Sequence, residues 1–149
     1  MGIVRTVVFC HDHPDGPGFD PDPAETGRRD LELAPAPPAG VFAAVGWRRA
    51  GLAAAVLAAT TPSRVDRLVL CCVPVPLDAD PGFDPGDIAA KTLVLFGQLD
   101  SEAPAAHARW WKEHIADARV EMVPRAGSDV IERLWKRILS HAAPHSLRR

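Results

Sequence analysis

The sequence predicts an α/β protein with a mostly parallel sheet and helices on both of its faces. Short runs rich in β-branched residues recur at 3–10, 41–47, 67–73 and 92–98, and helical patterns lie between them. Several of these runs are continuously apolar, as expected of parallel strands that are covered on both faces. Strands and helices that alternate at these spacings favour right-handed crossovers. We expect one domain, residues 1–149, because a chain of this length builds one core.

Six strands are predicted in all. IVRTVVFC at 3–10 comes first, followed by a weaker candidate, DLELA at 30–34. The central candidate strands are VFAAVGW, RLVLCCV and TLVLFGQ. The last candidate strand, RVEMVP at 119–124, is weaker. Residues 12–29 and 75–90 are rich in Pro, Gly and Asp, which predicts loops. Both loops follow strands, and loops at the carboxyl ends of parallel strands form the ligand crevice of such folds.

Three helices are predicted. The segment 50–60 is apolar on nearly every side, which predicts a buried crossover helix. The segment 103–115 has a mixed pattern, with Ser101 and Glu102 as its candidate N-terminal caps. The segment 130–142 has the spacing of one amphipathic helix, with apolar residues at i, i+3, i+4 and i+7: Ile131, Leu134, Trp135 and Ile138.

Composition excludes several classes of function. The net charge of -2 and the lack of a basic stripe argue against nucleic-acid binding. No apolar run has the length of a membrane span, and the beginning of the chain is too short and polar-flanked for a signal peptide. We therefore expect a cytoplasmic protein with no membrane partner. Its three cysteines, Cys10, Cys71 and Cys72, are an odd set in or beside apolar strands, which predicts reduced core thiols rather than disulfides.

Four stretches, taken in order, resemble the α/β-hydrolase fold superfamily. FCHDHP resembles its oxyanion-hole loop, and VGWRRAGLAAAVLAATTPSRVDRLVLCCVPVP resembles its nucleophile elbow, the following helix and the next strand. KTLVLFGQLDSEAP resembles the strand and loop that supply the catalytic acid. RVEMVPRAGSDVIERLWKRIL resembles the last strand, the histidine loop and the terminal helix. The resemblance implies a small member of this fold in which one loop replaces the usual cap domain.

The same resemblance implies a degenerate catalytic triad. Working hydrolases of this class carry G-x-S-x-G, then an acid, then a histidine. Here the turn reads GWRRAG, so that Arg48 stands at the nucleophile position, Asp100 at the acid position and Ser128 at the histidine position. An arginine side chain stays protonated and is no nucleophile, so the Ser-His-Asp mechanism is unavailable.

Arg48 would stand at the N-terminus of a helix, where the macrodipole disfavours a cation. We therefore expect a negative partner, Asp100 first and Asp12 second. Arg48 would either bind an anionic or carbonyl-bearing substrate, or form a structural pair with Asp100 that fills a dead site. A cation there could also lower the pKa of a neighbouring thiol, Cys71 or Cys72. The candidate substrate-binding residues are Asp12, Trp47, Arg48, Arg49 and Ser128.

His11 and His13 flank Asp12 at the end of a strand. An imidazole titrates near neutral pH, so either ring is a candidate general base; the alternative is a loop histidine bonded to its own backbone. His-x-His can also chelate a metal, but no further ligand has a clear spacing, so we expect neither a metal nor a cofactor. The candidate catalytic residues are His11, His13 and Asp100.

Two functions follow as hypotheses. The first is non-standard acyl transfer, in which the thiol of a second substrate attacks a small acyl substrate or a carrier-bound thioester, as the resemblance suggests for bacterial secondary metabolism. That reaction needs positioning and oxyanion donors but no enzyme serine. The second is a catalytically inactive pseudo-hydrolase that binds a ligand or a partner; simple ester hydrolysis is a weaker third. Trp110 and Trp111 cannot both face one core, and the more exposed one would mark a homodimer or partner contact.

Overall fold

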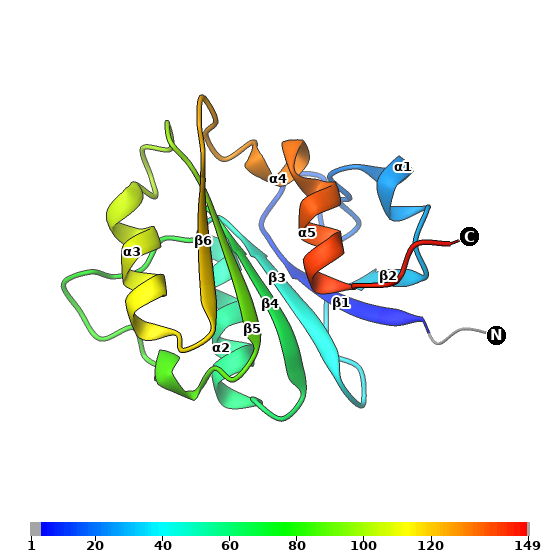
Figure 1. Ribbon diagram of the computed structural model, residues 1–149, viewed down its shortest axis with the longest axis horizontal. Coiled ribbons are helices and arrows are strands. Elements are labelled where there is room, and N and C mark those ends of the chain that lie inside the picture. Colours follow the sequence, from blue (N-terminus) through cyan, green and yellow to red (C-terminus); the bar gives the residue numbers. More distant parts are fainter. Residues whose placement is uncertain (1–3, 149) are drawn as a thin grey trace.

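A computed structural model describes residues 4–148 of the chain, and Figure 1 shows a single twisted sheet between helices. All of its strand pairings are parallel, in the order β2-β1-β3-β4-β5-β6. The strands are β1 (Arg5–Cys10), β2 (Leu31–Ala34), β3 (Phe42–Trp47), β4 (Val65–Cys71), β5 (Lys91–Gly97) and β6 (Ala118–Val123). The helices are α1 (Pro23–Thr26), α2 (Leu52–Thr60), α3 (Ala105–His114), α4 (Val130–Arg133) and α5 (Trp135–Ala142). Two short 3-10 turns are η1 (Arg49–Gly51) and η2 (Pro85–Asp87). The predicted parallel α/β architecture is confirmed, including both weaker strands.

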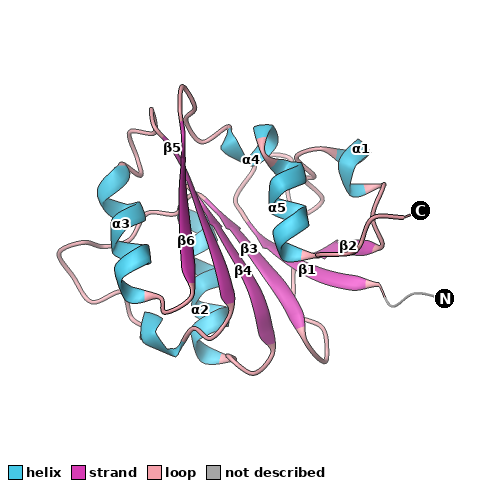
Figure 2. Cartoon of the chain, in the orientation of Figure 1, coloured by secondary structure: helices cyan, strands magenta, loops and turns pink. Residues whose placement is uncertain are grey.

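Each face of the sheet has its own helix layer. Leu68 and Leu70 of β4 pack with α2 and α3, whereas Val69 and Cys71 of the same strand pack with α4 and α5. This alternation follows from the two-residue period of a strand. Both faces of the central strands are therefore covered, which explains why their sequences are continuously apolar. Figure 2 shows α3 and α5 on opposite sides of the strands.

Two of the predicted helices differ from expectation. The helix that covers 50–60 begins as η1 and continues as α2, and it is buried along one side only: Val56 is 38% exposed. The predicted helix over 130–142 is interrupted at Leu134, whose φ of -115° and ψ of 23° leave the helical region. The break divides the segment into α4 and α5, which lie at an angle to each other in Figure 1.

The helix predicted over 103–115 also differs from expectation at its N-terminus. The helix α3 begins at Ala105 with Pro104 as its N-cap, and no side chain caps it. Ser101 and Glu102 therefore lie in the preceding loop rather than at its cap. The Asp100 side chain organises that loop, because its Oδ1 accepts hydrogen bonds from the backbone amides of Glu102 and Ala103 at 3.0 and 3.2 Å.

The crossover from β2 to β3 contains no helix. It consists of residues 35–41, PAPPAGV, although parallel crossovers usually need about a dozen residues. The register explains the short connection: Ala34 pairs with Val8 of β1, and Val8 pairs with Ala44. The chain must therefore descend only about two residues, roughly 7 Å, while it passes one strand. We call residues 35–41 the strap.

The strap leaves part of one sheet face without a helical cover. Arg64 holds it, since the guanidinium donates to the carbonyl of Pro38 and, at 3.2 Å, to that of Gly40. Toward the carboxyl end of β1, Pro35 and Ala53 of α2 line a cavity of about 400 Å³ with the loop after β1. The missing helix thus provides space beside the predicted site.

All three thiols are free. Cys71 and Cys72 are buried and Cys10 is half-buried, which confirms the prediction of core thiols. Burial raises the pKa of Cys10 to about 11. Within residues 4–148, no helix has the length and apolarity needed to cross a membrane.

Candidate functional site

The turn after β3 is a sharp strand-to-helix elbow. The backbones of Gly46 and Gly51 touch across it: a Cβ on Gly51 would lie 2.6 Å from the carbonyl carbon of Gly46. Arg48 stands at the apex with φ 61° and ψ -156°, a conformation that essentially only glycine adopts without strain. Its amide donates to the carbonyl of Cys71 at 3.0 Å, which joins the apex to β4. The sequence prediction of an intact elbow is confirmed.

The carboxylate that pairs with Arg48 is Glu102, and the expected Arg48–Asp100 pair is wrong. The Arg48 Nη2 lies 3.7 Å from the Glu102 Oε2, and the two side chains are 37% and 61% exposed. Asp100 is engaged with backbone amides of its own loop instead. A pair this exposed and this long contributes little to stability, so the guanidinium is available to a ligand.

Trp47 has a structural position. Its side chain is 5% exposed, and its Nε1 donates to the backbone carbonyl of Ser128 at 2.8 Å. This bond ties the elbow to the loop after β6. The Arg48 guanidinium carbon lies 5.4 Å from the centroid of the Trp47 ring, within the range of a cation–π contact. The Trp47 indole therefore helps to position the Arg48 guanidinium.

His11 and His13 both bond to the backbone of their own loop. The amide of His13 donates to Nδ1 of His11, and the amide of Asp15 donates to Nδ1 of His13, each at 3.1 Å. Because Nδ1 accepts in both rings, the proton of each neutral imidazole is on Nε2. In this arrangement each ring offers a hydrogen-bond donor rather than a base. Burial, and to a smaller degree His13, lowers the pKa of His11, and Asp12 opposes that shift.

An aromatic stack fills the space between the elbow and the loop after β1. Phe19, which sequence reasoning had not singled out, stacks on His13 with centroids 3.7 Å apart and an interplanar angle of 3°. The Trp47 ring lies 5.8 Å from Phe19 and 6.0 Å from His13. The loop position of Phe19 and the absence of any periodic pattern around it gave no signal of this contact. The stack packs His13 against Trp47 of β3, and the His11 ring meets Phe19 edge-on with centroids 5.4 Å apart.

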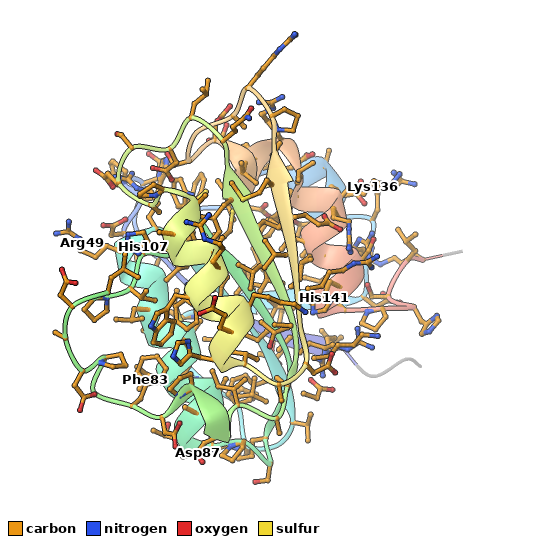
Figure 3. All side chains as sticks on the ribbon, turned by 60° about the vertical axis from the view of Figure 1, so that its left-hand side comes forward. Arg49, Phe83, Asp87, His107, Lys136 and His141 are labelled. Atoms are coloured by element: carbon orange, nitrogen blue, oxygen red, sulfur yellow. The ribbon has the colours of Figure 1, made fainter. Side chains whose placement is uncertain are left out.

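Three cavities surround the elbow. Pro35, Ala53, His11, Asp12 and His13 are among the residues that line the first, of about 400 Å³. The second has about 290 Å³ and lies against Arg49 and Glu102, and the third has about 260 Å³ and is lined by residues that include Arg48, Asp100 and Ser128. The structure thus brings Arg48, Asp100 and Ser128 to one cavity, and Asp12 with the two histidines to another. The Arg49 side chain is exposed, and Figure 3 shows it at the periphery of the molecule.

The Cys71 thiol next to the elbow is not activated. Burial is the main cause that raises the pKa of Cys71 well above its ordinary value, and Cys72 and Asp100 add to that shift. The alternative in which Arg48 activates a neighbouring cysteine is therefore wrong for Cys71. In the part of the chain that the structure describes, no three side chains of His, Cys, Asp or Glu are grouped so that they could hold a metal ion.

The parallel sheet, the strained elbow after β3 and the helices on both faces define the α/β-hydrolase fold, and the chain has this fold. No family model matches the sequence, and a search of curated proteins found no match. Solved structures do match. The 2-hydroxy-6-oxo-6-phenylhexa-2,4-dienoate hydrolase BphD of Rhodococcus sp. strain RHA1 superposes with a TM-score of 0.71 at 13% identity, over 92% of this chain and 90% of that chain.

Two further structures give the same result. A protein of Thermoplasma acidophilum described as a predicted CIB-like hydrolase has a TM-score of 0.69 at 16% identity, over 90% of this chain and 83% of that one. A meta-cleavage product hydrolase, CumD, has a TM-score of 0.65 at 15% identity, over 92% and 89% of the two chains. At these identities the similarity concerns the fold, and the function has to be argued from the site.

Proposed function

We propose that the protein is a catalytically inactive pseudo-hydrolase that binds a small carboxylate anion at the elbow. Arg48 carries this proposal: a permanently charged guanidinium stands at the apex in a strained backbone conformation, with only an exposed partner at 3.7 Å. Strained positions of this kind cluster at functional sites. A planar guanidinium also matches a carboxylate in two-pronged geometry.

The surroundings of Arg48 support binding rather than chemistry. Asp100 is occupied by loop amides, and Ser128 contributes its backbone carbonyl to Trp47. The cavity beside Arg48, at about 260 Å³, suits a short-chain acid. Arg48 directly precedes the helical segment that begins at Arg49, and the positive end of a helix dipole favours an anion.

The test is calorimetric titration with butyrate and hexanoate. We expect saturable binding that weakens about tenfold in Arg48→Gln, because a charge-assisted hydrogen bond is lost. The matched control is Arg109→Gln, an exposed arginine on α3, which should bind as the parent does. Equal binding by Arg48→Gln and the parent would overturn the proposal. Hydrolysis of p-nitrophenyl butyrate that survives Arg48→Ala but is lost in His11→Ala would also overturn it, in favour of an esterase.

A second candidate is acyl transfer from a small or carrier-bound thioester, favoured by the 400 Å³ cavity beside His11 and His13. In that reaction the thiolate of the second substrate attacks the thioester carbonyl carbon, and the Nε2–H of His11 or His13 stabilises the oxyanion. The carbon–sulfur bond to the first thiol then breaks, and that thiol leaves as a thiolate. No serine takes part.

Thioester exchange distinguishes the two candidates. Butyryl-N-acetylcysteamine and a second thiol, mixed with the protein, should give the exchanged thioester faster than buffer does if the second candidate holds. His11→Phe and His13→Phe should then slow the exchange, because they remove the Nε2 donors. An exchange rate equal to that of buffer would exclude acyl transfer and leave anion binding as the one remaining candidate.

A further inference from the structure

A further cavity, with a volume of about 210 Å³, lies at the amino-terminal ends of the strands, opposite the end of the sheet that carries the elbow. It forms where β4, β5 and β6 begin and where α5 ends. We call it the basic cavity, because its lining includes Arg67, Lys91, Arg119, Arg137 and His141. Figure 3 shows His141 beside the amino-terminal half of the sheet, far from Arg49 at the elbow.

The sheet register concentrates these charges. Arg67 pairs with Lys91 across β4 and β5, and Arg119 of β6 pairs with Leu93 of β5. Residues two apart on a strand share a face, so Lys91 and Leu93 point the same way. Three adjacent strands therefore each carry a cation near their start on the face that α5 covers, and Arg137 of α5 adds a fourth.

Little on the chain neutralises this cluster. Within residues 4–148, Arg137 is the one cation of the four with a carboxylate in ion-pair distance, Glu121 at 2.9 Å. Arg67 donates to the backbone carbonyl of His141 at 3.4 Å. Like charges directly opposite each other across strands destabilise a sheet. The chain as a whole carries a net charge of -2, so the cluster does not reflect composition.

His141 reports the positive potential of the basic cavity. Its ring is nearly buried, and its Nε2 donates to the carbonyl of Lys91 at 2.9 Å. Burial is the main cause that lowers the pKa of His141, the hydrogen bond to Lys91 opposes the shift, and Arg67, Arg137 and Lys91 add to it. The one acid that lines the basic cavity is Asp117, which is exposed.

We propose that the basic cavity binds a phosphate group, either as free phosphate or diphosphate or as the head of a small phosphate ester. Guanidinium groups match the geometry and charge of phosphate oxygens. The volume lies below the roughly 300–1,000 Å³ of cavities that hold drug-sized ligands, so it suits the phosphate group rather than a large attached body. The site is independent of the elbow and of the function proposed there.

Calorimetric titration with diphosphate tests the proposal. We expect saturable 1:1 binding that weakens about tenfold in Arg119→Gln and in Lys91→Gln. The matched control is Lys136→Gln, which removes an exposed cation that projects from α5 away from the basic cavity and should change the affinity less than twofold. No saturable binding, or equal affinity in all three variants, would overturn the proposal.

The titration of His141, followed by NMR, gives a second readout that needs no variant. A bound dianion offsets the surrounding cations, so saturating diphosphate should raise the pKa of His141. An unchanged His141 titration, or the same change with sodium chloride at equal ionic strength, would overturn the site.

Glycerol phosphate distinguishes the sources of the ligand. Binding of both glycerol phosphate and diphosphate would assign the site to a phosphate head group, and binding of diphosphate alone would assign it to the free anion.

Discussion

At the scale of the residue, the apex of the elbow is where the chain departs most from local preference. Arg48 holds a conformation that favours glycine, and a non-glycine residue there costs about 1–3 kcal/mol. The neighbouring backbone imposes this conformation, because Gly46 and Gly51 pack against each other and the Arg48 amide bonds to β4. An arginine kept under strain is consistent with the binding role proposed for it.

The strain at Arg48 predicts that a glycine variant is more stable than an alanine variant, the reverse of the order usual within a helix. Arg48→Gly should be more stable than Arg48→Ala by about 1 kcal/mol, because glycine adopts the conformation freely. Urea unfolding of the two variants measures the difference. An alanine variant as stable as the glycine variant would show that the apex is not strained.

The contact between Gly46 and Gly51 predicts a large effect of one methyl group. Gly51→Ala should lower the free energy of unfolding by about 3 kcal/mol, since its Cβ would overlap the Gly46 backbone. Gly18→Ala is the matched control, because a Cβ there meets no atom within 4 Å. Thermal unfolding of both variants checks this, and equal midpoints would contradict it.

At the scale of the element, the strap is the least ordinary connection. A proline-rich segment without a helix makes this parallel crossover, and the 400 Å³ cavity lies at its beginning. Arg64 fastens the other end through two carbonyls and lies 5.5 Å from the Phe42 ring centroid.

Loss of the Arg64 bonds should loosen the strap. Arg64→Ala should cost about 1–2 kcal/mol, because two carbonyls lose their charged donor. It should also speed hydrogen exchange at the amides of 39–42. Arg109→Ala, an exposed arginine on α3, should leave the exchange unchanged. Unaltered exchange at 39–42 in Arg64→Ala would show that the proline-rich sequence alone keeps the strap in place.

At the scale of the whole molecule, two histidines link stability to pH. Burial is the main cause that lowers the pKa of both His11 and His141 from the usual 6.5. The folded protein therefore binds protons at these rings less readily than the unfolded chain does. The contribution of these two neutral histidines to the free energy of unfolding is complete above pH 6.5. It is lost as the pH falls through the pKa values that the rings have in the folded protein.

Stability should accordingly decline between about pH 7 and pH 5, before most carboxylates begin to titrate. Urea midpoints measured across this range should fall in the parent and fall less steeply in His141→Gln. A midpoint that is constant from pH 7 to pH 5 would contradict the prediction.

The sequence by itself determined the parallel sheet, its six strands and the elbow. These depend on local patterns, namely continuous apolar runs, a glycine at each side of the turn and an apolar helix after it. Which side chains contact one another depends on the tertiary structure. Glu102 rather than Asp100 pairs with Arg48, Phe19 stacks on His13, and four cations gather at the amino-terminal ends of the strands. Such contacts join residues far apart in the chain, and only strand register and loop conformation bring them together.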